Sequence, residues 1–143
     1  MQLLRLCAEL RGRYDIAYVS TNPGAAAMLP EGARLHCVSD FSRWDAWRLP
    51  AVAWQLWRII GRERPRALIT TGAAPGLVAV AVARLRGVRT LWIDSIANAA
   101  TLSGSGKLAR RLAHGVFTQW PALAAGGIEY HGSVFGSKPS AAE

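Results

Sequence analysis

The fold class of this chain is decided by residues 67–93, ALITTGAAPGLVAVAVARLRGVRTLWI. Residues 67–71 predict a buried strand, because they form a short apolar run with β-branched side chains. Residues 75–86 predict a helix that starts at a proline and ends at Gly87, and residues 90–93 predict a second strand. A strand, a helix and a strand at this spacing are typical of a parallel βαβ unit.

The same alternation continues on both sides of this unit. We expect further helices at 1–11, 51–62 and 107–113, and further strands at 14–20, 34–38 and 116–119. The pattern predicts an α/β domain over residues 1–135 with a Rossmann-like, doubly wound, mostly parallel sheet, followed by a flexible tail over 136–143. In the common order of such sheets the first strand is central and precedes the first helix. Since this chain opens on a helix, either its first strand is missing through N-terminal truncation, which we favour, or the sheet is rearranged.

The composition restricts the partners and the chemistry. The chain has 143 residues, a net charge of +8 and 15 arginines among its 17 basic residues, which favours an anionic partner: a phosphate-bearing ligand, a membrane surface or nucleic acid. Two cysteines without a CxxC pair and three scattered histidines indicate neither a zinc site nor a disulfide framework nor a nucleophilic triad. We therefore expect no metal and no cofactor. The longest uncharged stretch, 67–83, is broken by Gly and Pro, so no transmembrane segment is expected.

Two loops follow the strands of the central unit, at the sheet edge where parallel sheets bind ligands. In the first, Gly72, Ala73 and Gly76 would let an anion approach the backbone at a helix N-terminus, and a tight strand-to-helix turn is the structural alternative. In the second, Asp94, with Ser95 and Asn98, would accept a proton or bind hydroxyl groups. Its alternative is a helix cap or an Asx turn.

A third loop precedes the basic helix at 107–113. Its residues are Ser103, Gly104, Ser105, Gly106 and Lys107. They resemble a phosphate loop but lack the first glycine and the final Ser/Thr of a Walker A motif. Backbone amides at a helix N-terminus would still bind a phosphate, and a capped helix with a solvated lysine is the alternative. The chain has no GxGxxG, which disfavours dinucleotide binding.

Tryptophan and arginine are concentrated around the helix at 51–62. The residues concerned are Trp44, Trp47, Arg48, Trp54, Trp57 and Arg58. Indole and guanidinium groups side by side suit a membrane interface. The more ordinary explanation is a helix that packs its Trp and Ile side chains on the sheet and points its arginines outward. We expect no nucleic-acid partner, because these aromatics lie among helix formers rather than on alternating strand positions.

Several motifs, taken in their order along the chain, resemble one family of glycosyltransferase subunits. They are residues 2–6 (QLLRL), 71–76 (TGAAPG), 92–98 (WIDSIAN), 101–103 (TLS), 105–107 (SGK), 118–123 (TQWPAL) and 130–135 (YHGSVF). The family is the acceptor-side subunit of the split N-acetylglucosaminyltransferase of lipid-linked oligosaccharide synthesis. The bacterial capsule and exopolysaccharide counterparts of that subunit are more similar still.

This resemblance implies the N-terminal half of a GT-B glycosyltransferase that is divided between two polypeptides. This chain would bind a polyprenyl-diphosphate-linked acceptor at the inner, cytoplasmic face of the cell membrane. A partner subunit would bind the UDP-sugar. The diphosphate would lie against Gly72, Ala73 and Gly76, Ser95 and Asn98, and residues 103–107. Asp94, the one candidate catalytic residue, would face the cleft as a base or as a hydroxyl contact, and Gln119 and Trp120 would shape the cleft.

The chain departs from the family pattern at two places. Family members have a strand and a Gly-Gly-His turn ahead of the first helix, where this chain starts at Met1. The segment after Asn98 is usually charged, and here it is Ala99-Ala100. The alternative function is a non-catalytic membrane scaffold that recruits the UDP-sugar-binding partner.

Overall fold

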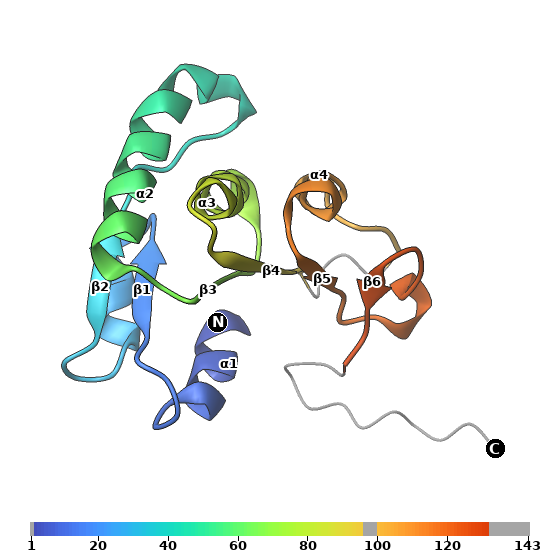
Figure 1. Cartoon of the computed structure of the whole chain (residues 1–143), viewed down its shortest axis with the longest axis horizontal. Coiled ribbons are helices and arrows are strands. Elements are labelled where there is room, and N and C mark those ends of the chain that lie inside the picture. Colours follow the sequence, from blue (N-terminus) through green and yellow to red (C-terminus); the bar gives the residue numbers. More distant parts are fainter. Residues whose placement is uncertain (1, 96–99, 132–143) are drawn as a thin grey trace.

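The computed structural model describes residues 2–95 and 100–131, in which helices and parallel strands alternate (Figure 1). The helices are α1 (Gln2–Leu10), α2 (Leu49–Glu63), α3 (Ala73–Leu85) and α4 (Gly104–Leu112). The strands are β1 (Ala17–Ser20), β2 (Arg34–Cys37), β3 (Ala67–Thr70), β4 (Arg89–Ile93), β5 (Gly115–Phe117) and β6 (Ile128–Glu129). Short 3-10 helices are η1 (Pro23–Met28), η2 (Arg43–Arg48) and η3 (Pro121–Leu123). The predicted α/β alternation is confirmed; β6 was not predicted, and the predicted tail at 136–143 lies outside the described residues.

The strands form two parallel sheets rather than one. β1 pairs with β2, with Tyr18 opposite Leu35. The second sheet has the order β3-β4-β5-β6, and all its neighbouring strands are parallel. No strand pairing joins β1 to β3 within residues 2–95 and 100–131. The interruption lies where the common doubly wound order places its first strand.

The helices form layers on the two sides of the sheets. α2, α3 and α4 lie on one side, and α1 lies on the other (Figure 1). Val52, Leu56 and Ile60 recur every four residues along α2 and are buried against α3. A second apolar cluster joins α3 to β4, with Trp92 of β4 fully buried. These clusters fix the starts of α3 and α4 beside the ends of β3 and β4.

The burial of β3 corrects one prediction. Residues 67–71 predict a buried strand, but no residue of β3 is fully buried, whereas Thr90, Trp92 and Ile93 of β4 are. The physical reason is that β3 is the edge of its sheet and has a hydrogen-bonded neighbour on one side only. The amino-acid composition of β3 is that of an interior strand, and its exposure is that of an edge.

Candidate functional site

The turn between β3 and α3 brings a helix N-terminus to the carboxyl edge of the larger sheet. Gly72 has φ 128° and Ala73 has φ 64°, so the chain reverses through two residues with positive φ. Ala73 is exposed, and the left-handed conformation costs a non-glycine residue about 1–2 kcal/mol. The N-cap of α3 is Gly72, which has no side chain to cap the helix. The turn is therefore a tight strand-to-helix turn, as the structural alternative expects.

Gly76 lies in the first turns of α3 and faces the sheet. A Cβ atom there would overlap Oγ1 of Thr70 on β3. The same hydroxyl accepts a hydrogen bond from the Gly72 N–H at 3.4 Å. Gly76 thus lets α3 pack closely on β3. Diphosphate binding by Gly72, Ala73 and Gly76 stays a prediction.

Replacing Gly76 with alanine is expected to lower the free energy of unfolding by about 1–3 kcal/mol, because the added methyl group must displace Thr70. Thr70→Ala in the same chain should recover part of this loss, since it removes the overlapping hydroxyl. Urea denaturation measures both effects. Gly104→Ala is the matched control: nothing lies within 4 Å of a Cβ at this helical position, so its stability should be unchanged or slightly higher. Equal losses at both glycines would contradict the packing role.

Asp94 follows β4 directly and is almost completely buried, with 2% of its surface exposed. Its Oδ1 accepts hydrogen bonds from the Ser103 hydroxyl at 2.7 Å and from the Trp92 indole N–H at 3.3 Å. Its Oδ2 accepts from the Ser103 backbone N–H at 3.0 Å. The carboxylate therefore ties the end of β4 to the start of α4.

The predicted phosphate loop forms the first turn of α4. Ser103 is the N-cap, and its Oγ accepts from the Gly106 N–H at 2.8 Å while donating to Asp94. A Cβ at Gly106 would lie 2.8 Å from Asp94 Oδ1, so the helix start rests directly on the carboxylate. Gly104 and Lys107 are exposed, and Ser105 is half-buried. Because a carboxylate already complements this helix N-terminus, the hydrogen bonds support the capped-helix alternative. Phosphate binding at residues 103–107 stays a prediction.

Gln119 extends the network to the end of β5. Its side chain is buried, and its Nε2–H donates to the Asp94 carbonyl at 3.1 Å. Trp120 is half-buried, and its backbone N–H donates to Thr118 Oγ1 at 3.2 Å. The sequence placed residues 94 and 103 in separate loops and residue 119 at the end of a strand, and the structure brings the three together at one sheet edge. Ser95 is half-buried beside them, and Asn98 lies outside the described residues.

Two members of this arrangement were not predicted. Trp92 of β4 and Thr118, which follows β5, open the motifs at 92–98 and 118–123, but the sequence assigned neither of them a role in the site. The alternation of β4 points residues 92 and 94 to the same face, and this period-two spacing is the signal that relates the indole to the carboxylate.

The tryptophans around α2 are exposed. Trp44 is 81%, Trp47 74% and Trp54 63% exposed, and with half-exposed Leu49 they form what we call the tryptophan surface. The guanidinium of Arg48 lies 5.1 Å from the Trp47 ring centre, and that of Arg86 lies 4.0 Å from the Trp57 ring centre. The alternative of tryptophans packed on the sheet is wrong, because Val52, Leu56 and Ile60 form the buried stripe of α2. Arg58 is exposed.

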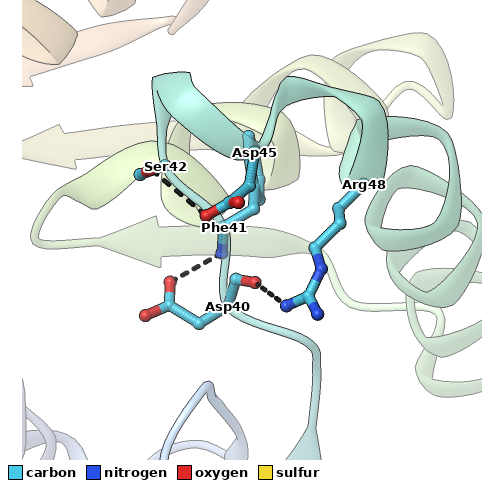
Figure 2. A pocket seen from close by; sticks show the side chains of 5 residues that line it. All are labelled: Asp40, Phe41, Ser42, Asp45 and Arg48. Carbon is cyan, nitrogen blue, oxygen red and sulfur yellow. Dashed lines mark hydrogen bonds between the residues drawn. The ribbon is translucent and has the colours of Figure 1, made fainter.

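A hollow of about 230 Å³ adjoins this surface after β2 (Figure 2). Its polar groups bond to one another: Ser42 Oγ–H donates to Asp45 at 3.3 Å, and Arg48 donates to the Asp40 carbonyl at 3.5 Å. The Asp40 carboxylate accepts from the Phe41 N–H at 2.9 Å. Two carboxylates beside one guanidinium make the hollow unsuited to a diphosphate.

Two negative findings concern residues 2–95 and 100–131. No group of three or more His, Cys, Asp or Glu side chains in this part of the chain is arranged to hold a metal ion. None of the helices described there has the length and apolarity needed to cross a bilayer.

Comparisons with known proteins show the fold. No family model and no curated protein matches the chain. The crystal structure of Acinetobacter baumannii MurG matches 98% of this chain with a TM-score of 0.76 and 12% identity. The chain has the fold of the N-terminal half of a GT-B enzyme. UDP-N-acetylglucosamine 2-epimerase from Rickettsia bellii matches 94% of the chain with a TM-score of 0.66 and 16% identity.

The chain is shorter than either similar protein. The chain spans 42% of the length of MurG and 42% of the length of the epimerase. The carboxyl edge that holds Gly72, Asp94 and Gln119 is the edge at which open α/β sheets bind ligands. The described site therefore lies where the fold places binding sites.

Proposed function

We propose that the chain is the acceptor-binding part of a two-component glycosyltransferase. It would transfer a sugar from a UDP-sugar to a polyprenyl-diphosphate-linked acceptor in polysaccharide biosynthesis. The observation that carries the proposal is the match of 98% of this chain to 42% of MurG, which corresponds to one half of a GT-B enzyme. The ordered motifs shared with acceptor-side subunits support the finer assignment. A partner subunit would contribute the half that binds the UDP-sugar.

The acceptor diphosphate would bind at the start of α3. The N-cap residue of this helix, Gly72, has no side chain to cap it, and the helix starts at the carboxyl edge of the sheet. The start of α4 is a poorer anion site, because Asp94 and Ser103 already complement it. Residues 95 and 103–107 would border the acceptor on its other side.

Asp94 would act as a positioning residue rather than as the catalytic base. A general base must reach the proton that it removes, and Asp94 is 2% exposed with both carboxylate oxygens accepting hydrogen bonds from this chain. The carboxylate would hold the end of β4 against the start of α4. The backbone carbonyl of Asp94, through Gln119, would hold the end of β5 beside them. The base would then come from another residue or from the partner.

The tryptophan surface would rest on the membrane that carries the lipid acceptor. Indoles favour the headgroup region, and Arg48 and Arg58 are exposed nearby for lipid phosphates. The net charge of +8 would add attraction to the anionic inner leaflet. This supports a peripheral location on the inner face of the cell membrane.

A non-catalytic membrane scaffold is the second candidate. The observation that favours it is the engaged carboxylate of Asp94, which keeps the predicted candidate base from reaching a substrate proton. A sugar-transfer assay separates the two functions. The chain is co-expressed with a UDP-sugar-binding GT-B half, and the pair is given vesicles that contain a polyprenyl-diphosphate-linked sugar and a panel of labelled UDP-sugars.

A further inference from the structure

Exposed arginines gather at the amino edge of the larger sheet, where β3 and β4 begin and where α2 and α3 end. We call this group the arginine edge; its members are Arg62, Arg64, Arg66, Arg84, Arg86 and Arg89, all exposed. Within residues 2–95 and 100–131, none of them forms an ion pair with an Asp or Glu side chain. A cluster of one sign of charge attracts ions of the other sign. The arginine edge therefore favours an anionic ligand, on the side of the sheet away from Gly72 and Asp94.

A hollow of about 200 Å³ lies at the arginine edge. It is lined by Ile60, Arg64, Pro65, Arg86, Gly87 and Val88, and no carboxylate is among these residues. The backbone N–H groups of residues 64 and 86–88 donate to carbonyl groups of α2 and α3. The donors that the hollow offers to a ligand are therefore the guanidinium groups of Arg64 and Arg86.

The guanidinium of Arg86 is held in place by α2. It lies 4.0 Å from the centre of the Trp57 ring, in the geometry of a cation–π contact. A Cβ atom at Gly61 would lie 2.8 Å from the same guanidinium. Glycine inside a helix costs about 1 kcal/mol relative to alanine, and here its missing side chain leaves the space that Arg86 occupies. A guanidinium fixed in this way loses little conformational entropy when it binds an anion.

Arg64 reaches the hollow from a strained position. It is the C-cap residue of α2 and has φ 47°, the left-handed conformation in which helices usually end on glycine. That conformation costs a non-glycine residue about 1–2 kcal/mol. Two locally unfavourable residues, Gly61 within the helix and Arg64 at its end, thus meet at one hollow. Local strain of this kind is concentrated at functional sites.

The structural alternative is that the arginines only complement the helix ends. The C-termini of α2 and α3 both lie at this edge, and each carries a partial charge of about −0.5. The two guanidinium groups of the hollow already exceed this charge, and four further arginines surround them. Glu63 is engaged elsewhere, because its carboxylate bonds to His36 at 2.7 Å and to Arg34 at 3.5 Å. An excess of positive charge therefore remains at the hollow.

We propose that this hollow binds a phosphate dianion, either free or as the terminal group of a phosphate monoester. Two guanidinium groups match its two negative charges, and each can donate a pair of N–H groups to its oxygens. A carboxylate offers one charge and two oxygens, so it would satisfy only one of the two arginines. The hollow is smaller than the roughly 300–1,000 Å³ of pockets for larger ligands, which fits a phosphate group with its waters. The proposal holds whether or not the chain transfers sugar.

NMR titration of the unmodified chain with inorganic phosphate, at constant ionic strength, tests the proposal. The amide signals of Gly87 and Val88 should shift and saturate, with an affinity at least about tenfold higher for phosphate than for acetate. Arg64→Gln and Arg86→Gln should each weaken phosphate binding by at least about tenfold, because each removes charged hydrogen bonds. Arg62→Gln is the matched control, since it removes the same charge from the arginine edge but not from the hollow. Its affinity should change by less than about threefold.

Gly61→Ala tests the positioning of Arg86 without changing any charge. The added methyl group must displace the guanidinium from its place beside Trp57, so phosphate binding should weaken by at least about fivefold. The variant should stay folded, because alanine favours the helix.

Three results would overturn the proposal. Equal affinity for acetate and phosphate would exclude a phosphate site. An equal loss in Arg62→Gln and Arg86→Gln would show a diffuse field of charge rather than a site in the hollow. Unchanged binding in Gly61→Ala would show that the placement of Arg86 has no role.

Vesicles distinguish the two sources of the phosphate group. Co-sedimentation compares phosphatidic acid, a phosphate monoester, with phosphatidylglycerol, a diester, at matched surface charge. A loss in Arg86→Gln on the monoester vesicles alone would support a lipid headgroup as the ligand. Equal binding of Arg86→Gln and the unmodified chain to both vesicles, with the loss confined to inorganic phosphate, would support a soluble phosphate.

Discussion

Replacing Asp94 with alanine is expected to lower the free energy of unfolding by about 3 kcal/mol. The substitution leaves the Ser103 N–H, the Ser103 hydroxyl and the Trp92 indole N–H without their shared acceptor in a buried position. Hydrogen bonds to charged groups contribute about 1.5–3 kcal/mol, and each buried donor left unpaired costs about 1–3 kcal/mol. Urea denaturation followed by tryptophan fluorescence measures the change.

Asp15→Ala is the control for the Asp94 variant. The Asp15 carboxylate is exposed and pairs with Arg34 at 2.9 Å, so its loss should change the free energy of unfolding by less than about 1 kcal/mol. A stable Asp94→Ala variant that has lost sugar transfer would contradict the positioning role and return Asp94 to the place of a catalytic base. A destabilised variant that regains transfer at low temperature would support the positioning role.

Replacing Trp44, Trp47 and Trp54 together with serine is expected to weaken binding to anionic vesicles by at least about 100-fold. Burial of one large apolar side chain contributes about 1.5–3 kcal/mol, so partial insertion of three indoles accounts for this loss. Stability should change little, because the three side chains are exposed in the folded chain. Co-sedimentation with vesicles that contain 30% anionic lipid measures the binding.

Leu85→Ser is the matched control for the tryptophan surface. Leu85 is 79% exposed at the end of α3, so its loss removes a similar exposed apolar group from another part of the molecule. Its vesicle binding should equal that of the unmodified chain. Equal loss in both variants would indicate non-specific apolar adsorption, and no loss in the triple variant would exclude the tryptophan surface as the membrane contact.

The alternation of helices and strands is predictable here because it rests on local periodicity. The stripe of Val52, Leu56 and Ile60 repeats every four residues, and the apolar run of β4 is short and bounded by Gly87. Local pattern also supplies the fold class, which the match to MurG confirms. Neither inference requires knowledge of residues that are distant in the sequence.

The burial of a strand and the contacts within the site depend on residues that are distant in the sequence. Local sequence patterns therefore predict them less well than they predict helices and strands. The apolar run of β3 predicts an interior strand. In the structure β3 pairs with β4 on one side only, so none of its residues is fully buried. Residues 104–106 are predicted as a loop ahead of the helix at 107–113, but with the Ser103 cap and the Asp94 carboxylate they form the first turn of α4. The exposure of Trp54 follows from which face of α2 the core occupies, and that face is fixed by α3.

The most direct test of the central claim is sugar transfer from a UDP-sugar to a polyprenyl-diphosphate-linked acceptor in vesicles. The account predicts labelled lipid product when this chain and a UDP-sugar-binding GT-B half are both present, and none when either is omitted. Product formed at the same rate by the UDP-sugar-binding half alone would contradict the account. A pair that binds the vesicles and yields no product with any UDP-sugar of the panel would also contradict it, and would favour the membrane scaffold.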